Sequence, residues 1–164
     1  MPRTGKVEKR PVQPDPLHQS PQVAKLINKV MVDGKKTLAQ KIVYGAFQTI
    51  AAQGQNPLTI FEKALENISP KMEVHSRRVG GASYMIPIEV RGTRRQSLAL
   101  SWLVAAARSR GPTAVKGPKN KPLAAATLAA EILEAALGSG KAVNKKEEMH
   151  RMAEANKAFA HFRW

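Results

Sequence analysis

Residues 72–90 read MEVHSRRVGGASYMIPIEV, and this stretch separates the chain from a purely helical protein. Apolar and polar side chains alternate along each half of it, and Gly80-Gly81 lies between the halves. An alternation of period two on both sides of a glycine pair predicts a β-hairpin. Pro87 has no backbone N–H to donate to a neighbouring strand, so its strand is expected at an edge.

A lone hairpin is only marginally stable in water, so the rest of the chain must supply a surface for it. On both sides of the hairpin, apolar residues recur at helical spacing. Ser20-Pro21 and Asn56-Pro57 are typical of helix starts, and Asp33-Gly34 is typical of a helix end. We therefore expect a mainly α fold with one hairpin and six helices, at about residues 20–33, 37–52, 56–69, 96–109, 122–137 and 141–158.

The spacing also predicts which side chains are buried. In the second expected helix the apolar stripe consists of Leu38, Ile42, Val43, Ala46, Phe47 and Ile50. Four glutamates share helix faces at i,i+3 or i,i+4 spacing, and in so basic a chain we interpret them as solvent-facing: Glu62, Glu66, Glu131 and Glu134. The last helix has a thin apolar stripe, so we expect it to rely on a partner surface.

The ends of the chain differ from its middle. Residues 1–19 carry four prolines, a density that prevents a helix, and several cations. We interpret this segment as an extended basic arm, although a disordered terminus without a function fits its composition equally well. Residues 20–164 are expected to form a single helical domain with the hairpin at about 72–90 and a basic loop at about 111–122.

The charge balance narrows the function. Lys and Arg number 27 against 12 Asp and Glu, which leaves a net charge of +15. Such an excess repels itself in a compact protein and is typical of a partner that is a polyanion. Nucleic acid is the commonest such partner, an anionic membrane surface is the second candidate, and a basic protein without a polyanionic partner is the third.

Several classes of protein are excluded or disfavoured. The sequence has no Cys, which excludes disulfides, thiolate zinc sites, cysteine nucleophiles and iron–sulfur clusters. No stretch approaches the roughly 20 apolar residues that a membrane span needs, and no membrane partner is expected. The first residues are charged and lack the apolar run of a signal peptide.

The basic residues gather where the expected elements turn. Guanidinium groups at exposed turns suit a phosphate backbone because they can bond phosphate oxygens in pairs. Glycines beside them let the backbone approach closely. Any single pair of basic residues could belong to an ordinary solvated loop. Five clusters with few acids among them instead favour RNA binding, and they lie at about residues 35–36, 77–78, 94–95, 108–121 and 141–146. The candidate RNA-binding residues are Arg3, Lys6, Arg10, Lys35, Lys36, Arg77, Arg78, Gly80, Gly81, Arg94, Arg95, Arg108, Arg110, Lys116, Lys145, Lys146, Arg151 and Arg163.

Aromatic residues occur among the cations at the C-terminal end, with Phe159, His161, Phe162 and Trp164 in six residues. Such rings can stack on unpaired bases. It is equally plausible that Phe159 and Phe162 pack the tail against the protein's own core.

No catalytic or metal site is expected. Gly34-Lys35-Lys36-Thr37 ends like a phosphate-binding P-loop, but Lys29 occupies the position of the first glycine and lies inside a helix. The four histidines lack metal-ligand spacing. No serine lies in a nucleophile motif. The sequence therefore indicates a binding protein without a cofactor rather than an enzyme.

Three motifs resemble one family. Residues 26–36, LINKVMVDGKK, followed by Ile42-Val43-Tyr44, are similar to the opening of ribosomal protein seven of the small subunit, bacterial type. Residues 77–84, RRVGGASY, followed by 87–91, PIEVR, resemble that family's hairpin, and residues 150–164 resemble its ending. The likeness covers about nine tenths of the chain in one order.

The resemblance implies a bundle of about six helices with a protruding β-hairpin. It implies binding to the 3′ major domain of small-subunit rRNA and early assembly of the subunit's head. It also implies a place near the exit-site tRNA and the outgoing mRNA, close to the ribosomal proteins numbered nine, eleven and thirteen. The expected location is the bacterial cytoplasm, with a mitochondrial or plastid ribosome as the alternative.

Three departures from the family pattern are visible. Ser101 stands where an arginine is common before the Trp of the fourth helix, and Met85 stands where glutamine is usual in the hairpin. The loop 111–122 is longer and richer in Gly and Pro than the family suggests. A basic protein that compacts DNA is the rival interpretation, which composition alone would permit.

Overall fold

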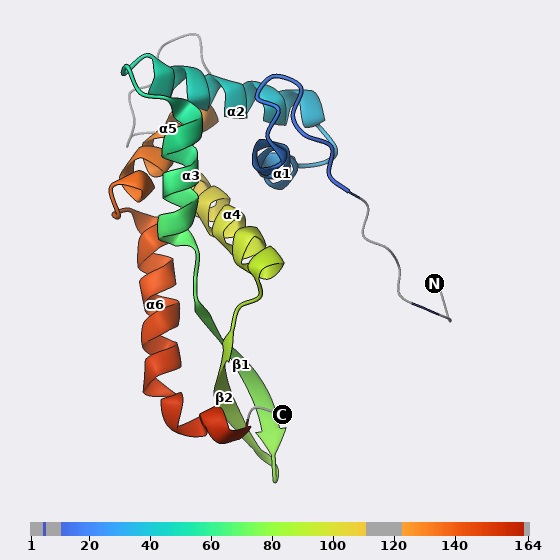
Figure 1. The fold of residues 1–164 in the computed structure, drawn as a ribbon, viewed down its shortest axis with the longest axis vertical. Coiled ribbons are helices and arrows are strands. Elements are labelled where there is room, and N and C mark those ends of the chain that lie inside the picture. The colour runs from blue at the N-terminus through green and yellow to red at the C-terminus, as the bar shows by residue number, and fades with distance from the viewer. Residues whose placement is uncertain (1–4, 6–10, 111–122, 163–164) are drawn as a thin grey trace.

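The structure is a computed structural model, and it describes residue 5 and residues 11–110 and 123–162. In this part of the chain, six α-helices, a short 3-10 helix and one two-stranded sheet follow one another (Figure 1). The elements are α1 (Pro21–Val30), α2 (Lys36–Ala51), α3 (Pro57–Ile68), β1 (Met72–Val79), β2 (Ala82–Glu89), α4 (Gly92–Ser109), α5 (Leu123–Ala136), α6 (Lys141–Ala155) and η2 (Lys157–Phe162).

The molecule is elongated. Figure 1 shows α1 to α5 gathered at one end, while α6 and the hairpin extend side by side toward the other. The mainly α fold with six helices and a protruding hairpin is confirmed. The hairpin therefore finds its supporting surface on α6 and η2, which contact its two strands.

Helix α5 is the centre of the helical body and contacts α2, α3 and α4. Its first half is rich in alanine, and these small side chains let its neighbours approach closely. A Cβ added at Gly45 of α2 would lie only 3.2 Å from the Cβ of Ala125. Larger side chains fill the rest of the core, among them Phe47, Phe61 and Ile132, which are at most 2% exposed.

The hairpin pairs antiparallel over its whole length, from Met72 opposite Glu89 to Val79 opposite Ala82. Gly80 and Gly81 form the tip with positive φ angles of 58° and 86°, a conformation that side chains with a Cβ rarely adopt. At the other end, the N–H of Val90 donates to the carbonyl of Lys71, which closes the base of the hairpin.

Several details of the predicted helices are wrong. Helix α4 begins at Gly92 rather than Gln96, so Arg94 and Arg95 lie inside its first turn. Leu38 is 48% exposed, because the buried position of that turn belongs to Ala39. The last α-helix ends at Ala155, and the chain continues as η2 instead of a regular helix.

The segment before α1 is held by a buried carboxylate. Asp15 is 3% exposed and accepts hydrogen bonds from the backbone N–H groups of Leu17 and His18. The hydroxyl of Tyr44 in α2 donates to the same carboxylate at 2.6 Å. Burial, together with this bond and the charge of Asp15, raises the pKa of Tyr44 to about 12. The turn at residues 15–18 is thus fixed to the body.

Candidate nucleic-acid interface

The loop between α1 and α2 presents two cations to solvent. Asp33 and Gly34 both adopt positive φ angles, 52° and 71°, which produce the sharp turn after α1. Lys35 and Lys36 follow this turn and are exposed.

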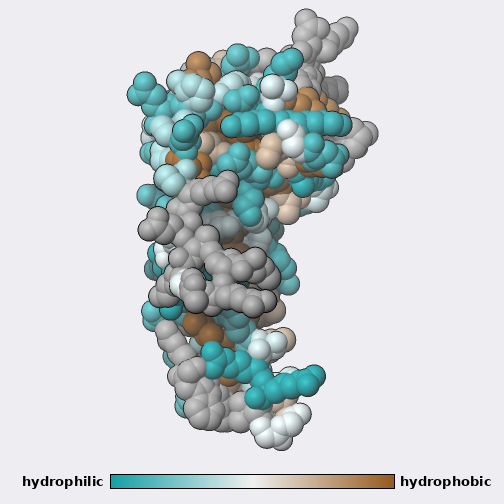
Figure 2. Space-filling model, turned by 90° about the vertical axis from the view of Figure 1, so that its right-hand side faces the viewer, coloured by the Kyte–Doolittle hydropathy of each residue, from teal (hydrophilic) through white to brown (hydrophobic). Residues whose placement is uncertain are grey.

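Figure 2 shows one face of the molecule, on which hydrophilic residues predominate and hydrophobic patches are scattered over the helical body.

The hairpin carries the second cationic site. Arg77 and Arg78 lie opposite Tyr84 and Ser83 near the tip, and both arginines are exposed. Gly80 and Gly81 are exposed as well, so the backbone at the tip can approach a ligand closely. The structure therefore brings these predicted residues together at the end of the molecule farthest from the helical body (Figure 1).

The base of the hairpin is joined to α4 by a charged cluster that the sequence analysis did not identify. Glu73 of β1 is 7% exposed and accepts from Arg94 Nε at 2.9 and 2.8 Å, and it contacts His75 Nε2 at 2.8 Å. Burial alone would raise the pKa of Glu73, but the bonds and charges of His75 and Arg94 outweigh it and lower that pKa. Arg94 thus has a structural partner, although its side chain stays 55% exposed.

Arg95 and Arg108 are also tied to the backbone. Arg95 is half-buried, and its Nη2 lies 3.5 Å from the carbonyl oxygen of Val90. Arg108 is exposed, and its Nη2 donates to the carbonyl oxygen of Val30 at 3.1 Å. Both bonds hold the guanidinium groups close to the surface of the body.

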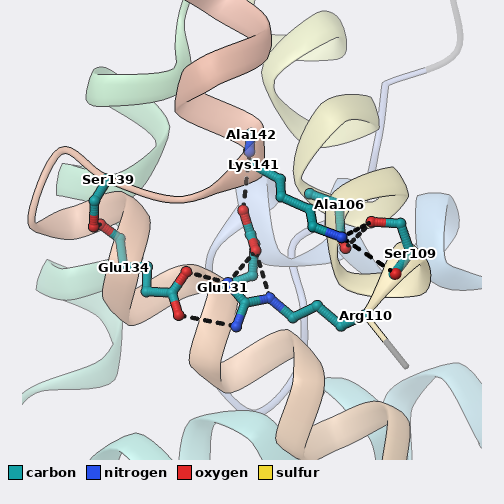
Figure 3. A network of polar contacts seen from close by, with 8 residues as sticks. All are labelled: Ala106, Ser109, Arg110, Glu131, Glu134, Ser139, Lys141 and Ala142. Carbon is teal, nitrogen blue, oxygen red and sulfur yellow. Dashed lines mark hydrogen bonds and ion pairs between the residues drawn. The ribbon is translucent and has the colours of Figure 1, made fainter. Parts of the chain in front are cut away.

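Arg110 lies in an internal network rather than on an open surface (Figure 3). Its Nε donates to Glu131 at 2.7 Å, its other nitrogens bind Glu134, and its side chain is only 12% exposed. The hydrogen bond with Glu134 is the main reason why the pKa of Arg110 is raised. The geometry gives Arg110 a role inside the protein.

The interpretation of Glu131 as solvent-facing is wrong. Its side chain is fully buried, and its Oε1 accepts from the backbone N–H of Ala142 at 2.9 Å. Since Gly140 offers no side chain to cap α6, the carboxylate of Glu131 takes that role from α5. Lys141 donates to the carbonyl of Ser109, so α4, α5 and α6 meet at this joint (Figure 3).

Helix α6 carries the third set of predicted cations. Lys145 is exposed and pairs with Glu148 at 2.7 Å, Lys146 is half-buried, and Arg151 is exposed. His150 of α6 accepts from the backbone N–H of Lys71 at 3.0 Å and so ties the helix to the hairpin. Burial and the charges of Lys146 and Lys71 lower the pKa of His150.

Phe159 of η2 packs against the hairpin in this structure. The rings of Phe159 and Tyr84 lie 5.1 Å apart, centre to centre. This contact favours the packing interpretation of Phe159. Five predicted residues lie outside the described part of the chain: Arg3, Lys6, Arg10, Lys116 and Arg163.

Among the described residues, neither a metal-binding cluster nor a single membrane-spanning helix is found. Among them, no group of three or more His, Asp or Glu side chains is arranged to hold a metal ion. In the same ranges no single helix is long and apolar enough to cross a membrane, whereas α5 and α6 pass that test only as a pair bent by 51°. Neither observation points to a different function.

Two of the missed features left traces in the sequence. Asp15 followed by Pro16 is a common start for a turn stabilised by a side chain, and it could have indicated the fixed segment before α1. Glu73 is an acid in a basic strand, which hints at an internal partner. Nothing local indicates that Glu131 reaches the start of α6.

A comparison with known protein families assigns nearly the whole chain to one of them. A model of the family described as "Ribosomal protein S7p/S5e" matches residues 2–157. The chain belongs to that family. The predicted relationship to ribosomal protein seven of the small subunit is therefore confirmed, and rRNA binding and translation agree with membership of the S7p/S5e family. This is a family of structural ribosomal proteins and not of enzymes.

Curated relatives in the S7p/S5e family match from end to end. "Small ribosomal subunit protein uS7" of Acetivibrio thermocellus is 54% identical over 165 aligned positions, which cover 100% of both chains. The proteins of the same name from Thermoanaerobacter pseudethanolicus and Alkaliphilus metalliredigens are 56% and 57% identical, again over 100% of both chains. The chain is thus similar to bacterial small-subunit proteins over its full length.

Proposed function

We propose that this protein binds the 3′ major domain of small-subunit rRNA and helps nucleate the head of the subunit in the bacterial cytoplasm. It contacts RNA mainly through phosphates and shape, as structural RNA-binding proteins do. The family resemblance supports this assignment, and so does the position of the exposed cations at the bends of the fold. An organellar ribosome of bacterial type is the alternative location.

The distribution of acids is the observation that carries the proposal. Asp15, Glu73 and Glu131 are buried and bonded inside the protein. They therefore do not balance the exposed Lys35 and Lys36 of the α1–α2 loop or Arg78 of the hairpin, whereas Glu148 pairs with Lys145 in α6. A surface of this kind keeps its repulsion until a polyanion binds. Folded RNA, with one phosphate per nucleotide, is the partner that fits cations spread over several bends.

We further propose that two parts of this surface face different RNA molecules. The cations of the α1–α2 loop and the base of α4, Lys35, Lys36, Arg94 and Arg95, contact the rRNA of the head. The hairpin tip, together with Lys145, Lys146 and Arg151 of α6, lies near the exit-site tRNA and the path of the outgoing mRNA. Ribosomal proteins nine, eleven and thirteen are the proposed neighbours.

The deciding experiment compares two polyanions of similar length. The purified chain is titrated with a transcript of the 3′ major domain and, separately, with random duplex DNA at the same salt concentration. We expect at least about a hundredfold tighter binding to the rRNA, because specific complexes exceed nonspecific ones by large factors. Equal affinity for both would contradict the proposal and favour the rival DNA-compacting protein.

A further inference from the structure

An apolar groove opens beside the basic loop between α1 and α2. It has a volume of about 310 Å³ and is formed by the end of α1, the start of α2, the end of α4 and the start of α5. Ile42 and Leu128 contribute to its lining. A volume of this order is at the lower end of the roughly 300–1,000 Å³ of typical small-molecule pockets in proteins.

Two aliphatic residues at the groove are unusually exposed. Val32 is 54% exposed and Leu38 is 48% exposed. Each lies within three residues of a lysine of the proposed RNA-binding loop. Large apolar side chains left in water next to a proposed binding surface are typical of a contact that forms with the partner.

The rim of the groove carries positive charge. Lys35 lies at one edge, and Arg108 lies at another, where its bond to the carbonyl of Val30 holds the guanidinium in place. The groove therefore combines an apolar interior with two cations and the carboxylate of Asp33 at its mouth, so its rim keeps a net positive charge. A nucleotide has the complementary arrangement, because its base has apolar faces and its phosphate carries the negative charge.

We propose that this groove takes one unstacked nucleobase of the bound rRNA, while Lys35 and Arg108 contact the adjoining phosphates. The inference rests on the proposed function and adds to it a base-seating site in the α1–α2 region. Single-stranded loops and bulges of RNA offer bases that can be turned outward into such a site. The base gains by leaving water for the aliphatic walls.

The test uses Leu38→Ala, which keeps a good helix former in α2 and removes most of one wall. We expect affinity for the 3′ major domain transcript to fall about three- to tenfold, which corresponds to about 0.7–1.4 kcal/mol, because the variant removes one of several aliphatic walls around the base. The slope of log affinity against log salt should stay unchanged, because no phosphate contact is lost. Leu137→Ala is the matched control, because Leu137 is 83% exposed and lies away from the groove at the end of α5.

Chemical probing of base edges gives a second measurement. Dimethyl sulfate and a carbodiimide reagent should detect one or two nucleotides that the wild type and Leu137→Ala protect and that Leu38→Ala leaves reactive.

Unchanged affinity and protection with Leu38→Ala would overturn the proposal. If that variant instead lowers the melting temperature with RNA binding intact, a segment of the same chain covers the groove. If binding weakens only once neighbouring ribosomal proteins are added, a protein side chain is the occupant. Failure of the wild type to prefer rRNA over DNA would overturn the proposed function itself.

Discussion

Glu131 shows how a single carboxylate joins three helices. It neutralises Arg110 at the end of α4 and caps the first turn of α6 from its own position in α5. Because the side chain is fully buried, it has no access to water that could compensate for a lost partner. Both ends of the joint depend on the same two oxygen atoms.

We predict that Glu131→Ala destabilises the protein by about 3 to 5 kcal/mol, the range for breaking a buried ion pair by removing one partner. The measurement is the free energy of unfolding in urea at neutral pH. Glu148→Ala is the control: Glu148 pairs with Lys145 on the surface, and its removal should cost less than about 1 kcal/mol. Similar losses for both variants would contradict the structural role of Glu131.

His150 provides a prediction about pH. Burial, Lys146 and Lys71 lower the pKa of His150 in the folded protein, whereas Glu154 opposes them. The unfolded chain therefore binds a proton more readily, and the stability contributed by neutral His150 is present above its ordinary pKa of 6.5 and is lost as the pH falls below it. Protonation would also remove the acceptor for the N–H of Lys71.

The wild type should accordingly lose more stability between pH 7.5 and pH 5.5 than His150→Ala does. The experiment measures urea unfolding of both proteins at each pH, so that contributions from other groups cancel in the difference. If both proteins lose the same amount, His150 has no lowered pKa in the folded state.

The hairpin is held at its base and exposed at its tip. Its base is fixed by Glu73 and Arg94, its side by α6, and its glycine tip and two arginines remain exposed. An element that is rigid at its base and cationic near its tip can position phosphates without reading bases.

We predict that replacing both Arg77 and Arg78 with Ala weakens binding to the 3′ major domain transcript. It should also lower the slope of log affinity against log salt by about one unit for each lost phosphate contact. The control replaces Lys41 and Lys63 with Ala, which changes the net charge equally at exposed helix positions outside the proposed surface. An unchanged slope in the arginine variant would remove these residues from the phosphate-contacting set.

The elements themselves could be predicted from the sequence because their signals are local. The starts of α1 and α3 follow from proline at the first helical position, and in α3 the side chain of Asn56 accepts from the N–H of Leu58 as a cap should. The hairpin follows from its alternation and its glycine pair. Helical periodicity locates an apolar face to within about one residue.

Contacts between elements could not be predicted in this way. Arg110 and Glu131 are 21 residues apart, and only the packing of α4 on α5 brings them together. The exposure of Leu38 likewise depends on the neighbours of α2 and not on its own spacing. For the candidate site, the sequence identified exposed cations at the α1–α2 loop and the hairpin, but it could not separate Arg110, which has internal partners, from those that face solvent.

At the scale of the whole molecule, the fold separates a helical body from a long projection. The body holds the core around α5, and the projection consists of the hairpin, α6 and η2 (Figure 1). Cations are present on both parts. The proposed function therefore requires an RNA surface that meets both parts at once, which a folded rRNA domain provides.

We predict that the chain in cell extract sediments with small-subunit particles and is scarce in the free protein fractions. Antibody detection across a sucrose gradient measures this distribution. In a second gradient, the salt concentration of a magnesium-free buffer is raised until the subunits lose their proteins. The chain should then move to the top of the gradient. A chain that sediments alone under mild conditions would contradict assignment to the small subunit.

The clamp between Asp15 and Tyr44 has a consequence for the residues that precede it. It gives the leading segment a fixed point of attachment on α2. Fourteen residues reach at most about 50 Å from such a point, whatever path they take. If the body binds rRNA as proposed, the cations of this segment stay within that radius of the clamp, so their effective concentration near the adjoining RNA is far higher than that of a free peptide. Cleavage of the chain at Asp15 would turn the proposed contact between this segment and the RNA from an intramolecular one into a bimolecular one.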